Sequence, residues 1–229
     1  MANGRTRSTW EALTGVAFVA LCVIAAAIRG EQLKPGAAAA DVVRYFTENR
    51  SQVLGSSAGW FVAAIPLLWF LGVLRSHMRS TDVGERLAAT AFGGGIFGVA
   101  FLTASSCGYV AAALEIARAG TEPLAVRGFY DLAGALFAMS GIGFAVFYWA
   151  TASAGLRDRS LPSWLCWFAV AAGAVQLLYA IGLMVSHGPL ANGGSLGILE
   201  PLFSMCWFAV ASVVLFLKPP PETASNPRR

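Results

Sequence analysis

Six long apolar stretches dominate this sequence, and each reaches or approaches the roughly 20 residues that an α-helix needs to cross a bilayer. They cover about residues 11–28, 53–74, 87–114, 132–156, 161–185 and 196–217. Within lipid only helices and closed barrels satisfy all their backbone polar groups, and these stretches lack the alternating pattern of barrel strands. The sequence therefore predicts an all-α, polytopic integral membrane bundle of six transmembrane helices.

The composition supports a membrane protein without a separate soluble domain. Hydrophobic residues make up 57% of the chain and charged residues 12%, whereas about a quarter of the residues in soluble domains are charged. The predicted connections are short, so residues 1–229 are interpreted as a single domain. Membrane lipids are the expected partners, an amphipathic small molecule is a candidate ligand, a homo-oligomer is compatible with this composition, and no nucleic-acid partner is expected.

The distribution of basic residues predicts the orientation of the bundle. With six spans both termini lie on one side, which would carry ten basic residues: Arg5, Arg7, Arg75, Arg79, Arg86, Arg157, Arg159, Lys218, Arg228 and Arg229. The opposite side would carry six: Arg29, Lys34, Arg44, Arg50, Arg118 and Arg127. The positive-inside rule then places both termini in the cytoplasm. Because nearly all the basic residues are Arg, and Ala and Gly are abundant, we expect a bacterial plasma (inner) membrane.

The N-terminus allows a second interpretation. Arg5 and Arg7 precede an apolar run that ends in Ala25-Ala26-Ala27, as in a cleavable signal peptide. Removal of residues 1–27 would leave five spans. The continuation of the run to Ile28, with Arg29 as a flank, favours a retained first helix.

The longest outer connection contains a predicted amphipathic helix over residues 37–50. Ala39, Val42, Val43 and Phe46 recur at helical spacing, with charged residues between them. Such a segment either packs on the ends of the spanning helices or forms a lid over an outward cavity.

The third stretch is predicted to lie at the centre of the bundle. It carries Gly93-Gly94-Gly95, Gly98 and Gly108, and small residues allow helix backbones to approach closely in lipid, where no hydrophobic drive assists packing. A second local pattern links the last two stretches, because 166–171 and 206–211 share the sequence Cys-Trp-Phe-Ala-Val-Ala. This repeat either reflects an inverted relationship, as in some transporters, or is a coincidence among common membrane residues.

The sequence contains no arrangement that indicates catalysis or metal binding. Cys22, Cys107, Cys166 and Cys206 all lie in apolar stretches without a C-x-x-C pair. His77 and His187 fall on opposite sides of the membrane in this topology. We therefore expect no metal and no cofactor, and we assign no catalytic residue.

Polar residues near the outer side provide the one candidate site. Gln176, Tyr179 and His187 share a helical face on the fifth stretch. Glu200 begins the sixth, and we predict that these four converge with Asp131 on a cavity that opens outward beneath the 37–50 helix, because polar side chains at membrane depth often mark functional cavities. Alternatively Glu200, which precedes Pro201, lies at a helix N-terminus, where the helix dipole favours an anion.

The order of several motifs resembles that of a known group of proteins. These motifs are Asp41-Val-Val-Arg-Tyr-Phe-Thr-Glu-Asn-Arg50, Leu68-Trp-Phe-Leu-Gly-Val-Leu-Arg75, Ala91-Phe-Gly-Gly-Gly95, Tyr130-Asp-Leu-Ala133 and Leu161-Pro-Ser-Trp-Leu165. The chain resembles a widespread group of small six-helix bacterial membrane proteins classified as a domain of unknown function. The resemblance supports the fold and implies no activity or catalytic residues.

Three functional interpretations follow, in order of preference. The first is a non-enzymatic membrane component or lipid-associated protein. The second is a small transporter or channel subunit that uses an outward polar cavity. The third is a membrane-embedded enzyme, such as an acid-initiated cyclase of prenyl chains with Asp131, Glu115 or Glu200 as proton donor.

Overall fold

The computed structural model describes residues 10–31, 33, 36–78, 82–118, 122–184 and 196–217, and every regular element in these ranges is a helix. The helices are α2 (Thr14–Arg29), α3 (Ala39–Glu48), α4 (Arg50–His77), α5 (Asp82–Glu115), α6 (Pro123–Asp158), α7 (Ser163–Gly182) and α8 (Leu196–Leu217). The predicted all-α class is therefore confirmed.

Five of these helices, α4 to α8, are long and apolar enough to cross a membrane. The first predicted stretch forms the shorter apolar helix α2, whose 16 residues extend about 24 Å. In contrast, α5 has 34 residues and α6 has 36, so each exceeds the roughly 30 Å thickness of the hydrocarbon core. The multi-pass architecture is confirmed, with helix ends that extend past the apolar stretches.

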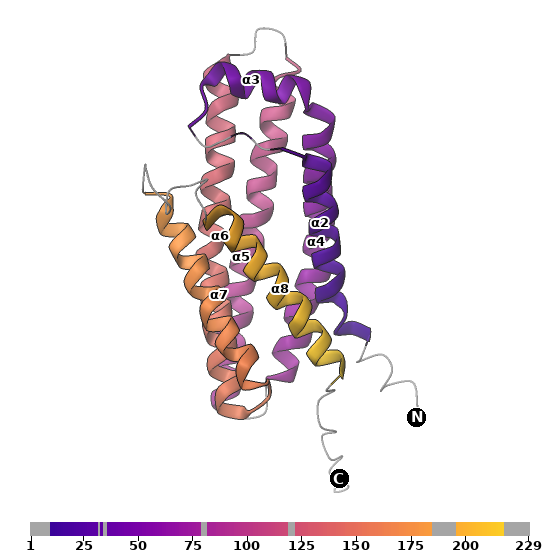
Figure 1. The fold of residues 1–229 in the computed structure, drawn as a ribbon, viewed down its shortest axis with the longest axis vertical. Coiled ribbons are helices and arrows are strands. Elements are labelled where there is room, and N and C mark those ends of the chain that lie inside the picture. Colours follow the sequence, from indigo (N-terminus) through magenta and orange to yellow (C-terminus); the bar gives the residue numbers. More distant parts are fainter. Residues whose placement is uncertain are drawn as a thin grey trace, which may run out of the picture.

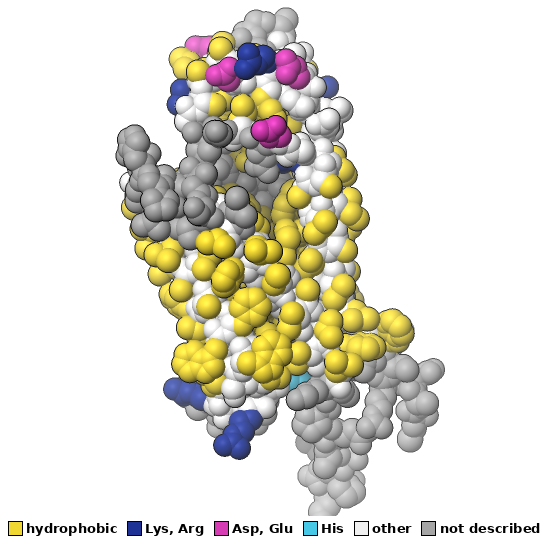
Figure 2. All heavy atoms as spheres, in the orientation of Figure 1, with side chains coloured by type: hydrophobic (Ala, Val, Ile, Leu, Met, Phe, Trp, Pro, Cys, Tyr) yellow, Lys and Arg dark blue, Asp and Glu magenta, His cyan; other side chains and the backbone are white. Residues whose placement is uncertain are grey.

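Helix α2 and the five long helices form a closed ring of neighbours. Each of α4 to α7 packs against the next helix in the chain, α8 packs against α2, and α2 packs against α4. Figure 1 shows that α2 begins and α8 ends at one end of the bundle, whereas α3 crosses the other end. In Figure 2 yellow apolar side chains cover most of the visible height, and acidic and basic side chains gather around α3. The short amphipathic helix is thus confirmed, and we call its side the α3 end.

Aromatic side chains fill the middle of the ring. The ring of Phe208 lies 5.3 Å from that of Phe18 and 5.7 Å from that of Phe70, between centroids, and stacks on Phe147 at 5.6 Å. Next to it, the indole Nε1–H of the fully buried Trp207 donates a 3.2 Å hydrogen bond to the carbonyl of Leu165. Helix α8 therefore joins α2, α4, α6 and α7 in one core.

The third stretch is not at the centre of the bundle. Its helix α5 packs mainly against α4 and α6, and Phe97 is 40% exposed on its outer side. The glycines do bring backbones together: a Cβ on Gly94 would lie 2.8 Å from the carbonyl oxygen of Gly143 on α6. On the α4 side, a Cβ on Gly95 would lie 2.7 Å from a methyl group of Leu71. Close approach on two sides is confirmed, but the aromatic residues of α8 take the central place.

The repeated hexapeptide has no matching environment in the two helices. Trp167 on α7 is 63% exposed, whereas Trp207 on α8 is fully buried. The cysteines show the opposite pattern, since Cys166 is buried and Cys206 is exposed. Equivalent positions therefore face different surroundings, which favours coincidence over an inverted repeat.

Helix α3 is held on the bundle by a second, smaller core. Its Val42 and Phe46 are fully buried together with Val53, Ala112, Ala113 and Val126. Below it, Arg50 Nε donates a 2.9 Å hydrogen bond to the carbonyl of Ala113 and so joins the start of α4 to the end of α5. These contacts favour packing of the 37–50 segment on the helix ends over a loosely placed lid.

Adjacent glycines provide a test of the α5–α6 contact. The change Gly94→Ala forces a methyl group against the backbone of α6, and we expect a loss of about 1–3 kcal/mol of stability. The control Gly93→Ala meets open space and gains helix propensity, so its stability should be unchanged or higher. Thermal unfolding of both variants in detergent measures the difference, and equal melting temperatures would contradict the close contact.

Candidate functional site

The structure brings two of the predicted site residues into direct contact. Gln176 on α7 and Glu200 on α8 are 1% and 7% exposed. The Gln176 side-chain amide donates from Nε2 to Glu200 Oε1 at 2.5 Å and to Ser204 Oγ at 2.6 Å. Because Glu200 and Ser204 are four residues apart, they lie on the same face of α8. A polar cluster thus connects α7 and α8 inside the bundle.

This polar cluster, made of Tyr148, Gln176, Glu200 and Ser204, retains unused hydrogen-bonding capacity. Gln176 Oε1 and Glu200 Oε2 are buried without a hydrogen-bond partner, whereas the Tyr148 hydroxyl interacts with Ser204. Tyr148 reaches the cluster from α6 and interacts electrostatically with Glu200. A buried polar atom without a partner costs about 1–3 kcal/mol, so such atoms indicate a place where a proton, a water molecule or a ligand group is held.

The helix start explains the position of Glu200. Helix α8 begins at Leu196, so Glu200 lies one turn inside it and Pro201 is an internal residue. The carboxyl group turns toward Gln176 rather than capping the helix N-terminus. Among the described residues, no cation forms an ion pair with Glu200.

The other predicted site residues lie apart from this contact. Asp131 forms an ion pair with Arg127 on the exposed side of α6, with 3.4 Å between Asp131 Oδ2 and Arg127 Nε. Tyr179 packs edge-on against Phe137, with ring centroids 5.7 Å apart, and lies within electrostatic reach of Glu200. His187 lies outside the described residues. Of the five predicted residues, two touch and a third is adjacent to them.

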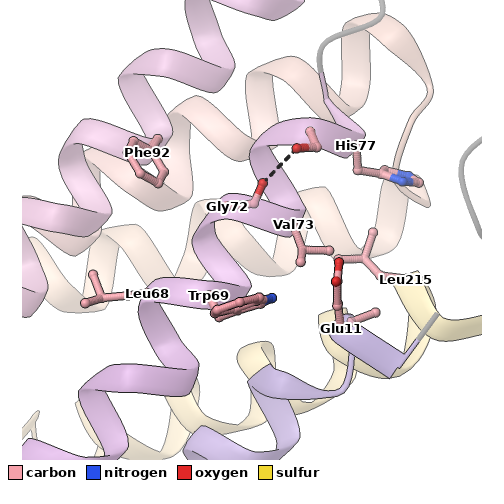
Figure 3. Close-up of a pocket in the computed structure, with 10 residues that line it drawn as sticks. Glu11, Leu68, Trp69, Gly72, Val73, His77, Phe92 and Leu215 are labelled. Carbon is pink, nitrogen blue, oxygen red and sulfur yellow. Dashed lines mark hydrogen bonds between the residues drawn. The ribbon is translucent and has the colours of Figure 1, made fainter. Parts of the chain in front are cut away.

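A groove that sequence reasoning missed lies at the opposite end of the bundle, where α2 begins and α8 ends. It encloses about 460 Å³. Figure 3 shows residues from α4, α5, α8 and the start of the chain around it. It is lined by Glu11, Ala12, Leu68, Trp69, Gly72, Val73, Ser76, His77, Phe92 and Leu215.

The groove combines apolar walls with a polar edge. Leu68, Trp69, Val73 and Phe92 supply the walls, and Glu11, Ser76 and His77 supply polar groups. Ser76 Oγ donates to the carbonyl of Gly72 at 3.1 Å, and His77 Nε2 lies 3.1 Å from the carbonyl of Ser160. Sizes of a few hundred Å³, apolar lining and a few polar groups are typical of small-molecule sites.

The described residues contain no group of three or more His, Cys, Asp or Glu side chains placed to hold a metal ion. The four cysteines are free thiols on four different helices.

Comparison with known proteins adds no relative. The sequence matches no family model, no curated protein and no solved structure at a significant level.

The amide of Gln176 is the donor on which the polar cluster depends. Replacing it in Gln176→Leu leaves the Glu200 carboxyl without its donor, and we expect a loss of about 1–3 kcal/mol of stability. In the double variant Gln176→Leu/Glu200→Leu the loss should be smaller than the sum of the single losses, because neither partner is left alone. Unfolding in detergent measures these values, with the exposed Gln52→Leu as control. Strict additivity would contradict the coupling.

Proposed function

We propose that this chain is a non-catalytic membrane protein that binds an amphipathic, lipid-like molecule in the groove beside α4. The observation that carries the proposal is the groove itself, in which walls formed by four apolar side chains adjoin the polar groups of Glu11, Ser76 and His77. Apolar walls hold an acyl or prenyl chain through burial, and a few polar groups orient the headgroup.

The polar edge suggests the class of headgroup. Glu11 is an acceptor when ionised, and the Ser76 hydroxyl already donates to the carbonyl of Gly72. A headgroup that ends in hydroxyl or ammonium donors, such as ethanolamine, therefore fits this edge better than one that ends in anionic oxygens. Trp69, which is 58% exposed on the groove wall, is a residue type that favours the membrane interface.

A second candidate function is a small transporter, and the buried Glu200 favours it. Glu200 has no cationic partner among the described residues, and an intramembrane carboxyl of this kind commonly serves ion or proton coupling. The prenyl-cyclase interpretation has less support, since Asp131 and Glu115 form ion pairs with Arg127 and Arg118 on the surface rather than facing Glu200.

The location and family are part of the same proposal. We infer a bacterial plasma membrane with both termini in the cytoplasm, supported by the excess of basic residues on that side. We also infer membership of the six-helix group of unknown function, supported by the order of the motifs from Asp41 to Leu165.

Gly72 allows the groove to be filled without disturbing the helix packing. A Cβ at Gly72 meets no atom within 4 Å, so Gly72→Leu places its side chain in open space. We expect cross-linking of a diazirine-tagged phosphatidylethanolamine in nanodiscs, read by mass spectrometry at 68–76 and around Phe92, to fall about tenfold, the effect of a 1.4 kcal/mol change.

The matched control is Gly93→Leu, which also enters open space and does not line the groove. It should cross-link like the parent. Equal labelling of the two variants, or no labelling of the parent at these positions, would contradict the proposal.

The orientation has its own test in intact cells. A thiol introduced by Ser80→Cys, between α4 and α5, should resist an impermeant maleimide, whereas one introduced by Glu48→Cys on the exposed face of α3 should react. The parent chain, with its native cysteines, serves as background. Labelling at position 80 and protection at position 48 would reverse the proposed orientation.

A further inference from the structure

A buried arginine lies at the α3 end of the bundle, far from the groove. Arg29 is the last residue of α2 and is only 5% exposed. Its Nε donates to Ser56 Oγ at 3.2 Å and its Nη2 to Ser57 Oγ at 3.4 Å, both on α4. Its Cζ lies 4.0 Å from the centroid of the Tyr109 ring on α5. Hydroxyl groups and a ring face stabilise this cation without neutralising it.

Unlike Arg29, three surface arginines at the same end form ion pairs with carboxylates. Arg44 pairs with Asp41 at 2.8 Å, Arg118 with Glu115 at 2.8 Å, and Arg127 with Asp131 at 3.4 Å. Each of these pairs is exposed to solvent, where an ion pair contributes little. Among the described residues Arg29 has no carboxylate within ion-pair distance, although burial makes an unneutralised charge costly.

One tyrosine, Tyr109, contacts the guanidinium group, and two others lie near it. Tyr109 and Tyr130 contact edge to face at 6.0 Å between centroids, and Tyr45 and Tyr130 interact electrostatically with Arg29. The Tyr130 hydroxyl donates to the carbonyl of Leu33. Burial raises the pKa of Tyr45 on α3, although Arg29 acts to lower it, so this hydroxyl keeps its proton near neutral pH and can donate a hydrogen bond.

The partners of the guanidinium group are neutral. Its Nε and Nη2 donate to the two serines, and it also forms a hydrogen bond with the Tyr109 side chain. Among the described residues these partners leave the positive charge without a counter-ion, so an anion near the guanidinium group is attracted to it. Arginine binds phosphate through charge-assisted N–H bonds, which are stronger than its bonds to neutral hydroxyl groups.

We propose that Arg29, with the hydroxyl groups around it, binds a phosphate group at the α3 end of the bundle. Arg29 ends the apolar helix α2 on the side of the bundle that α3 covers, so a lipid phosphate would approach it from that interface. The phosphate can come from a phospholipid headgroup or from a free anion. This site is independent of the groove and of the amphiphile proposed there.

The test is the melting temperature of the full chain in a neutral detergent at constant ionic strength. The probes are inorganic phosphate, dihexanoyl phosphatidylglycerol, and dihexanoyl glycerol as a lipid without phosphate. At saturating probe we expect the parent to melt about 2–4 °C higher with at least one phosphate probe and unchanged with dihexanoyl glycerol. A shift with phosphatidylglycerol alone identifies a lipid headgroup, and a shift with both phosphate probes identifies a general phosphate site.

Variants separate binding from the structural role of Arg29. In Arg29→Gln the probe-dependent shift should vanish, whatever the melting temperature without probe. The control Arg127→Gln, which removes an exposed arginine that is already paired, should keep the full shift. Should Arg29→Gln fail to fold, the double variant Ser56→Ala/Ser57→Ala keeps the positive charge but removes the two hydroxyl groups that position the guanidinium group. It should at least halve the probe-dependent shift in melting temperature. The absence of any shift in the parent, or an undiminished shift in the Arg29 or serine variants, would overturn the proposal.

Discussion

The closure of this bundle depends on the packing of Phe208 among aromatic rings from three other helices. Its neighbours Phe18, Phe70 and Phe147 come from α2, α4 and α6, so a residue near the end of the chain holds together elements from its beginning and middle. Lipid offers no hydrophobic drive for helix association, and dispersion contacts must supply the attraction. Large rings at the centre and small residues between α5 and α6 are two solutions to the same requirement.

Polar side chains within the bundle fall into two groups. Thr103 donates to backbone carbonyls three or four residues earlier, which uses the single donor of its hydroxyl within α5. Gln176 and Arg29 instead reach across to another helix. Cross-helix groups depend on the tertiary structure for their partners. Among the described residues, Gln176 and Glu200 each keep one buried acceptor atom without a partner, so part of the unused hydrogen-bonding capacity lies between α7 and α8.

Parts of the candidate site could be predicted from the sequence. Helical spacing placed Glu200 and Ser204 on one face, and the short connection between the last two stretches made α7 and α8 neighbours, so the Gln176–Glu200 contact was within reach of sequence reasoning. The groove was not, because Glu11, Phe92 and Leu215 come from the start of the chain, α5 and α8, and their proximity depends on how the ring closes. Similarly, the glycines of α5 predicted close contacts but not a position on the rim of the ring.

By itself the sequence determined the helical class, the approximate spans and the amphipathic α3, because these follow from bilayer thickness, backbone hydrogen bonding and the 3.6-residue period of a helix. The tertiary structure decided which apolar face meets which neighbour. A transmembrane helix is apolar on nearly all sides, so hydropathy does not distinguish its buried face from its lipid face. Tertiary packing does: Trp207 is enclosed and packs against Phe147 of α6, whereas Trp167 is 63% exposed on α7, although their local sequences are the same.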